Sequence, residues 1–219
     1  MSTHIDHLLN ETRRFAPSAK FAANAVATSE LFEQASADRL EFWAEQSRTL
    51  LHWDKPFTQT LDWSNPPFAK WFADGELNVA YNCLDRHVEA GNGERVALYW
   101  EGENGDSRAV TYAELTDEVK RLANVLTDLG IGQGDRVAIY MPMILELPIA
   151  MLACTRIGVA HSVIFGGFSP DSLAGRILDC DSELVITADE GLRGGKPVPL
   201  KKNVDLALLQ CPGVKKVLV

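Results

Sequence analysis

The pattern of hydrophobic and polar positions divides the chain into three regions. Residues 1 to about 50 contain no β-branched runs, and from Ser29 onward apolar residues recur at roughly helical spacing, which predicts an amphipathic packing helix. Residues 51–80 combine tryptophan and phenylalanine with Pro56, Pro66 and Pro67, and proline excludes a continuous helix or a central strand. Because aromatic side chains bury large areas, we expect an ordered, irregular strap that wraps over another domain.

From residue 81 onward, short apolar runs alternate with helical patterns. Strands buried on both faces are nearly continuous in their hydrophobicity, and strand–helix alternation implies right-handed crossovers. The predicted fold class is therefore α/β, with a mostly parallel sheet and flanking helices, preceded by a helical and irregular N-terminal extension. The predicted strands are residues 136–141, 158–164, 183–187 and 214–219, and the predicted helices are 145–157, a helix opening at 169–171, and 200–210.

A hairpin and a helix precede this sheet in the sequence. Residues 96–100 and 108–112 are predicted strands, because a glycine- and asparagine-rich turn separates them. Thr111 stands three residues before Glu114, which is the spacing of a capping box, and we expect a helix from there to about Asp128. Gly130 should end that helix.

Composition and charge exclude several classes of protein. The 219 residues carry a formal net charge of −9, which argues against a nucleic-acid partner. The aromatic strap lacks the interleaved Arg and Lys side chains expected of a base-stacking platform. The four cysteines are widely spaced without a Cys-x-x-Cys pair, as expected for reduced thiols. We find no secretory signal and no apolar window long enough for a bilayer, so we expect a cytoplasmic protein without a membrane partner. The oligomeric state stays open.

The segment 165–170, Phe-Gly-Gly-Phe-Ser-Pro, has the features of a ligand-binding loop. It follows a predicted strand and precedes a predicted helix, so it lies at the carboxyl ends of parallel strands, where ligands bind. Its two glycines allow close approach to the backbone, and the helix N-terminus favours negative charge. A tight turn that needs glycine for its geometry is the alternative, and the pattern leaves both open.

Residues 188–197 form a second such segment after the next strand. Arg193 and Lys196 flank two glycines, which predicts a flexible basic loop in an otherwise acidic protein. Arginine suits phosphate because its donors form a rigid fork. A solvated surface loop is the alternative. Since both segments follow adjacent strands, we expect them to line the same edge of the sheet.

Other glycine-rich stretches do not have the spacing of nucleotide loops. Residues 130–134 lack the dinucleotide-binding spacing and precede a strand, and at Gly195-Lys196 a proline replaces the Ser or Thr of a phosphate loop. We interpret both as turns. His161 lies within a predicted strand and is assigned no role.

Several of these segments together closely resemble the acetyl-coenzyme A synthetase family, the short-chain acyl branch of the adenylate-forming (AMP-binding) enzymes. The resemblance covers nearly the whole chain and is weakest over the first 30 residues. The matching segments are residues 78–87, 111–115, 135–142, 162–170, 184–191 and 199–202, together with Arg193 and the tryptophan-rich strap.

This resemblance implies a two-step ligase that uses acetate, ATP with Mg²⁺, and coenzyme A (CoA). In the family, the loop matching Phe165, Gly166 and Gly167 contacts CoA, and the positions matching Arg193 and Lys196 reach its nucleotide phosphate. Family members often have arginine at the latter position, so Lys196 keeps the charge but loses the planar fork. The resemblance places no catalytic residue in this chain, and the ATP, Mg²⁺ and acetate sites are expected beyond residue 219.

The expected organisation is an N-terminal helical and aromatic strap region, residues 1–80, and the first part of the AMP-binding large domain, residues 81–219. The last predicted strand has nothing after it, which suggests a partial sequence that is inactive alone. Two alternatives remain. The first is a ligase for propionate or another short acid, and the second is a non-catalytic nucleotide-binding α/β module.

Overall fold

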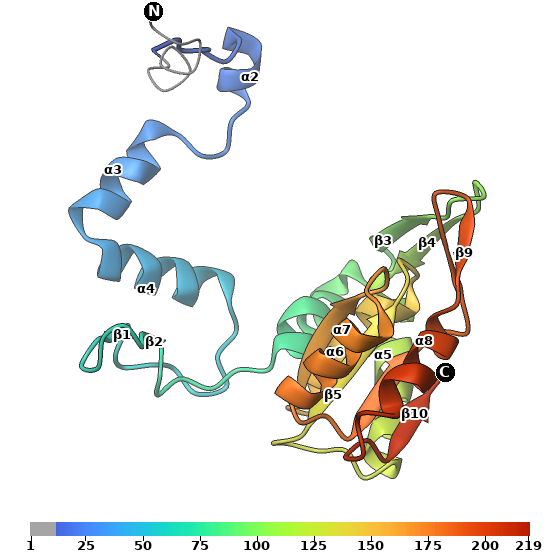
Figure 1. Ribbon diagram of the computed structural model, residues 1–219. Coiled ribbons are helices and arrows are strands. Elements are labelled where there is room, and N and C mark those ends of the chain that lie inside the picture. Colours follow the sequence, from blue (N-terminus) through green and yellow to red (C-terminus); the bar gives the residue numbers. More distant parts are fainter. Residues whose placement is uncertain (1–11) are drawn as a thin grey trace, which may run out of the picture. The chain divides into compact units, whose positions relative to one another are not determined.

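The computed structural model describes residues 12–219, which divide into two compact units (Figure 1). Of the described residues, the first unit comprises 12–50 and Gln59–Ala73, and the second comprises Leu51–Thr58 and Asp74–Val219. The predictions for residues 1–11 lie outside the described residues. The boundary at residues 80 and 81 stays a prediction, and each unit is described by itself below.

Two helices occupy the place where the sequence suggested one packing helix. After the short α2 (Ala19–Ala23), α3 spans Ser29–Ala37 and α4 spans Arg39–Leu50. Asp38 separates them because its backbone is extended and its Oδ1 accepts hydrogen bonds from the N–H groups of Leu40 and Glu41, both at 3.0 Å. Asp38 thus acts as the N-cap of α4. The apolar spacing alone predicted one helix and gave no indication of this break.

The aromatic strap is irregular, as predicted, but its burial is uneven. It contains the two-residue strands β1 (Leu61–Asp62) and β2 (Lys70–Trp71), paired antiparallel. Phe57 is only 7% exposed and packs edge-on against Trp53. Trp63 and Phe68 are 51% and 69% exposed. That the strap wraps over another domain stays a prediction. Phe57 belongs to the second unit, whereas Trp63 and Phe68 belong to the first.

The second unit is built on a four-stranded parallel sheet, which confirms the predicted α/β class. Its strands are β5 (Arg136–Met141), β6 (Ala160–Phe165), β7 (Leu184–Thr187) and β10 (Lys216–Leu218), in the order β10-β7-β5-β6. Side chains alternate across central β5: Val137 and Ile139 face one core, Ala138 and Tyr140 the other. β6 is an outer strand of the described sheet, so it is only partly buried.

Helices cover both faces of this sheet (Figure 1). α5 (Tyr112–Asp128) and α6 (Glu146–Arg156) supply one core, and α7 (Pro170–Asp179) and α8 (Leu200–Leu208) supply the other. The predicted capping box of Thr111 and Glu114 opens α5, and Gly130, with a φ of 81°, follows its last turn. Pro148 is tolerated in the first turn of α6, where no helical N–H partner is lost.

Two hairpins extend from the carboxyl end of the sheet. The first is the predicted pair β3 (Val96–Glu101) and β4 (Ser107–Thr111). The second joins β8 (Gly191–Arg193) to β9 (Lys196–Val198) and replaces the flexible loop expected there. The prediction of a flexible loop was wrong because Gly194 and Gly195 both have positive φ values, 58° and 72°, which suit a two-residue hairpin turn.

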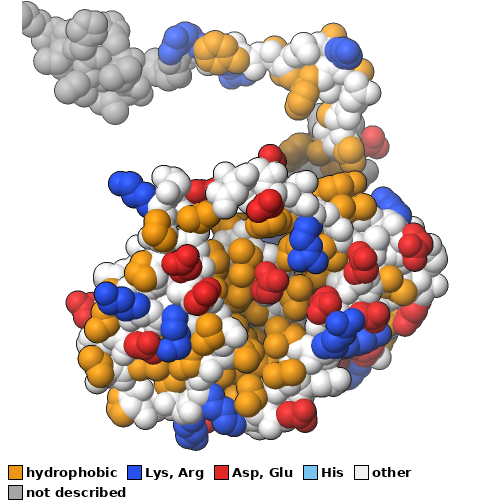
Figure 2. Space-filling model, turned by 90° about the vertical axis from the view of Figure 1, so that its right-hand side faces the viewer, with side chains coloured by type: hydrophobic (Ala, Val, Ile, Leu, Met, Phe, Trp, Pro, Cys, Tyr) orange, Lys and Arg blue, Asp and Glu red, His pale blue; other side chains and the backbone are white. Residues whose placement is uncertain are grey.

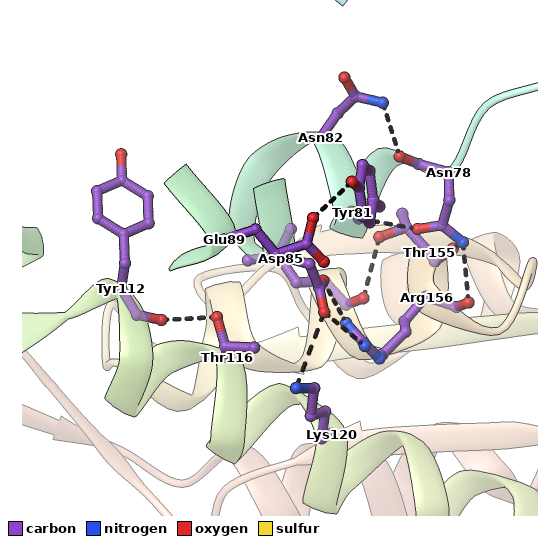
Figure 3. Close-up of polar contacts among 11 residues, drawn as sticks. Asn78, Tyr81, Asn82, Asp85, Glu89, Tyr112, Thr116, Lys120, Thr155 and Arg156 are labelled. Carbon is purple, nitrogen blue, oxygen red and sulfur yellow. Dashed lines mark hydrogen bonds and ion pairs between the residues drawn. The ribbon is translucent and has the colours of Figure 1, made fainter. Parts of the chain in front are cut away.

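A segment for which the sequence predicted no element lies against α5 and α6 (Figure 3). It contains two π-helical turns, η1 (Tyr81–Asp85) and η2 (Val88–Asn92). Asp85 accepts two hydrogen bonds from Arg156, at 2.7 and 2.9 Å, and Lys120 Nζ lies 3.8 Å away. Asn78 adds a hydrogen bond to the carbonyl oxygen of Arg156 at 3.0 Å. These contacts fix the segment to the sheet's helices.

Hydrophobic side chains also reach the surface. Figure 2 shows a face on which they run across the middle, with charged side chains around them. In the described part of the chain the outer strands β6 and β10 each have one neighbour, and Val163 of β6 is half-exposed. Scattered exposed apolar residues are common, whereas a continuous apolar area is typical of a contact surface.

None of the described helices is long and apolar enough to cross a bilayer.

Candidate functional site

The loop between β6 and α7 is held in place by the side chain of Tyr140 in β5. The Tyr140 side chain is buried, and its hydroxyl lies 3.0 Å from the carbonyl oxygen of Gly166 and 2.9 Å from that of Phe168. It also accepts a hydrogen bond from Asn203 of α8 at 3.2 Å. Ser169 then caps α7, accepting from the backbone N–H of Ser172, at the place where the sequence predicted that a helix opens. The loop is therefore a fixed feature of the fold.

The two loop glycines lie in crowded positions for different reasons. A Cβ on Gly166 would stand 3.3 Å from the backbone oxygen of Met141, so this glycine lets the loop pack on the end of β5. A Cβ on Gly167 would stand 2.3 Å from a terminal nitrogen of Arg193 and 2.6 Å from the Phe165 ring. Gly167 therefore leaves room for the arginine side chain.

The β8–β9 hairpin is attached at its base and projects its charges at its tip. At the base, a Cβ on Gly191 would come within 2.6 Å of Pro142, so the hairpin packs closely on the end of β5. At the tip, Arg193 pairs directly with Lys196 across the turn. Residues opposite each other in an antiparallel pair project to the same face, and like charges in that position repel. An anion at this position would relieve that repulsion.

The structure brings the two predicted segments together. The Arg193 guanidinium carbon lies 4.6 Å from the centre of the Phe165 ring, within the range of a cation–π contact. Phe165 meets Phe168 edge-on, with ring centres 5.6 Å apart. The prediction that both segments line one edge of the sheet is confirmed for Phe165, Gly167 and Arg193. Lys196 is exposed on the same hairpin as Arg193. Gly166, between Phe165 and Gly167, is half-buried.

Glu103, in the turn between β3 and β4, completes the site. Its two carboxylate oxygens accept hydrogen bonds from the backbone N–H groups of Gly194 and Gly195, each at 2.9 Å. These bonds, with the charge of Arg193, hold the pKa of Glu103 below its usual value, the Gly195 bond contributing most. The carboxylate is therefore ionised at neutral pH.

These residues suit the binding of an anion rather than bond-making chemistry. A planar guanidinium, an ammonium, two glycines and an aromatic face can hold a phosphorylated ligand by positioning alone. Among residues 12–219, no three His, Cys, Asp or Glu side chains gather in a way that could hold a metal ion. Burial raises the pKa of Cys154 to about 11, so that thiol is not activated as a nucleophile.

Sequence reasoning missed three residues that shape this site. The sequence pattern placed Tyr140 in a predicted strand and Gly191 in a predicted loop, and indicated no further role for either. A two-residue Gly-Gly turn between short β-like segments is a hairpin signal, so β8 and β9 could have been found. Glu103 gave no signal, because its contacts lie 91 and 92 positions further along the chain.

Comparison with known proteins places this arrangement in a family. Residues 84–218, more than half of the chain, match the AMP-binding enzymes, and residues 28–83 match the acetyl-coenzyme A synthetase N-terminus. The chain therefore belongs to the family of AMP-binding enzymes, and its parallel sheet with helices on both faces is consistent with part of that domain.

Three similar curated proteins carry the same description. The chain is 66% identical over 213 residues to the acetyl-coenzyme A synthetase of Streptomyces avermitilis and 67% identical to that of Streptomyces coelicolor; each match covers 97% of this chain. It is 57% identical over 208 residues to the enzyme of Mycobacterium tuberculosis, with 94% covered. The matches cover 32%, 33% and 32% of those proteins, so the chain spans about a third of the length of its curated relatives.

Proposed function

We propose that this chain is the N-terminal third of an acetate–CoA ligase of the AMP-forming type and that it carries part of the CoA site. The support is the high identity to proteins named acetyl-coenzyme A synthetase and the anion-binding arrangement at the sheet edge. Phe165, Gly166 and Gly167 contact CoA, and Arg193 and Lys196 bind its nucleotide phosphate. ATP, Mg²⁺ and acetate bind to residues beyond 219.

The proposed reaction has two steps that balance separately. An acetate oxygen attacks the α-phosphorus of ATP, the bond to the β-phosphate breaks, and pyrophosphate leaves with acetyl-adenylate formed. The CoA sulfur then attacks the acetyl carbon, the bond to AMP breaks, and the thiol proton is released. Residues that only position CoA should affect the second step and not the first.

One observation carries the proposal for the site: Arg193 lies over Phe165 and beside Gly167, although these residues come from different loops. A guanidinium held on an aromatic face keeps its outer N–H groups free for a phosphate. Lys196 directly across the hairpin adds a second positive charge. Gly167 leaves the space that the Arg193 side chain occupies beside the Phe165 ring.

The first test is Arg193→Ala in the full-length gene product. We expect the KM for CoA to rise roughly tenfold to a hundredfold, the usual worth of a charged hydrogen bond to phosphate. Acetate-dependent exchange of pyrophosphate into ATP should be nearly unchanged, because it reports the first step alone. Dephospho-CoA should lose much less affinity than CoA, since it lacks the 3′-phosphate.

The matched control is Arg121→Ala, which removes an equal charge from an exposed position on α5. It should leave both half-reactions and the KM for CoA as they are. An equal loss of both half-reactions in Arg193→Ala would mean that the hairpin is structural, and an unchanged KM for CoA would contradict the proposed site.

We also propose a cytoplasmic location. All four cysteines are free thiols, and Cys154 and Cys211 are buried, which suits a reducing compartment. Fractionation of cells that express the gene product, followed by detection of the protein in the cytosolic fraction, tests this location.

A further inference from the structure

We propose that Glu103 is a positioning residue of the CoA site, whose carboxylate holds the Gly194–Gly195 turn so that Arg193 stays over Phe165. The inference rests on the proposed function, because it names the residue that sets the geometry of that site. Glu103 touches neither the acyl group nor the nucleotide in this account, and it acts through the hairpin.

The contact itself is specific. Each oxygen of the Glu103 carboxylate accepts one hydrogen bond, from Gly194 N–H and from Gly195 N–H, both at 2.9 Å. Successive backbone N–H groups in a turn can form a concave anion site, and Gly194 and Gly195, both with positive φ, make such a turn. A carboxylate of this chain occupies that site, so the turn is bound to the β3–β4 hairpin, which lies beside it (Figure 1).

The β8–β9 hairpin needs such support. It has only three residue pairs, and a short two-stranded hairpin is marginal in water. Arg193 and Lys196 carry like charges and face each other across the turn, which weakens the hairpin further. Gly191 fixes its base against Pro142, but that contact does not restrain the tip. The negative charge of Glu103 at the turn both offsets the repulsion and sets the position of the tip.

The supporting hairpin is itself attached to the sheet. The indole N–H of Trp100 in β3 donates to the carbonyl oxygen of Met143 at 2.8 Å. Met143 directly follows Pro142, the residue against which Gly191 packs. Both hairpins are therefore fixed to the same segment after β5, and Glu103 closes the connection between their tips. Removing one side chain opens that connection without disturbing the core.

The experiment uses Glu103→Ala and Glu103→Gln in the full-length gene product. For Glu103→Ala we expect the KM for CoA to rise roughly threefold to tenfold, while acetate-dependent pyrophosphate exchange is unchanged. Hydrogen exchange of residues 191–198 should become faster in the absence of CoA. Glu103→Gln keeps one acceptor oxygen in place, so both effects should be smaller.

Glu101→Ala is the matched control. Glu101 is an exposed acid on the same hairpin, and in the described part of the chain its side chain makes no hydrogen bond or ion pair. Its loss changes the net charge equally and should change neither the KM for CoA nor the exchange of residues 191–198. The two proposals fail in different ways. If Arg193→Ala leaves the KM for CoA unchanged, the proposed CoA site itself is contradicted.

If Arg193→Ala raises that KM and Glu103→Ala does not, the CoA site stands and the role of Glu103 is overturned. A lower KM for CoA in Glu103→Ala would also overturn it, because the carboxylate would then be competing with the ligand for the turn.

Discussion

At the residue scale, Gly167 controls where the Arg193 side chain can lie. An added Cβ would meet the far end of that side chain at 2.3 Å, and φ at Gly167 is not in the left-handed region. The backbone therefore tolerates alanine, but the Arg193 and Phe165 side chains have to move. We expect Gly167→Ala to raise the KM for CoA several-fold while leaving pyrophosphate exchange unchanged, measured in steady state on the full-length gene product.

Gly175→Ala is the matched control for this prediction. Gly175 lies within α7, the helix that follows the same loop, and its added Cβ would meet nothing within 4 Å. Alanine there should leave the KM for CoA unchanged and stabilise the helix by roughly 0.5–1 kcal/mol. If the two variants bind CoA equally well, the position of Arg193 over Phe165 is not the binding position.

At the element scale, the Asp85–Arg156 pair joins η1 to α6 and gives a pH dependence. The two hydrogen bonds from Arg156 hold the pKa of Asp85 below its usual value of 3.8. A lowered pKa stabilises the fold at pH values above 3.8, and the stabilisation is lost as the pH falls below it through the folded-state value. The side chains of Asp85 and Arg156 are 14% and 24% exposed, so screening by water is incomplete.

We therefore expect Asp85→Asn to lower the free energy of unfolding by roughly 2 kcal/mol at neutral pH, because it leaves Arg156 without its counter-charge. Urea titrations over a range of pH values would measure this. The difference from the unsubstituted protein should shrink as the pH falls below 3.8. Glu118→Gln, which breaks the exposed pair with Arg121, should change little at any pH. A difference independent of pH would contradict the role of the charge.

The elements also show what local sequence could predict. The capping box at Thr111 and the opening of α7 at 169–171 were predicted correctly, because each depends on residues within one helical turn of each other. The break at Asp38 was local too, but apolar spacing outweighed it in the interpretation. The π-helical turns of η1 and η2 had no recognisable pattern, because contacts such as Asp85 with Arg156 lie far apart in the sequence.

The candidate site divides in the same way. Its glycines and cations could be found from the strand–loop–helix pattern, since carboxyl ends of parallel strands meet at one edge. The roles of these residues came from the family resemblance and stay proposals. Glu103 and the Tyr140 hydroxyl could not be found, because hydrogen bonds between distant segments depend on how the hairpins and α8 fold onto the sheet.

At the scale of the whole molecule, the proposed CoA contacts lie within the described residues, and we expect adenylation to need residues beyond 219. No nucleotide phosphate loop was found in the sequence, and the chain covers about a third of its relatives. We therefore expect the purified 219-residue chain to release no pyrophosphate from ATP in the presence of acetate and Mg²⁺. The full-length gene product, assayed in parallel, should release it. Pyrophosphate release that depends on acetate in the 219-residue chain would mean that adenylation uses residues now assigned only to CoA.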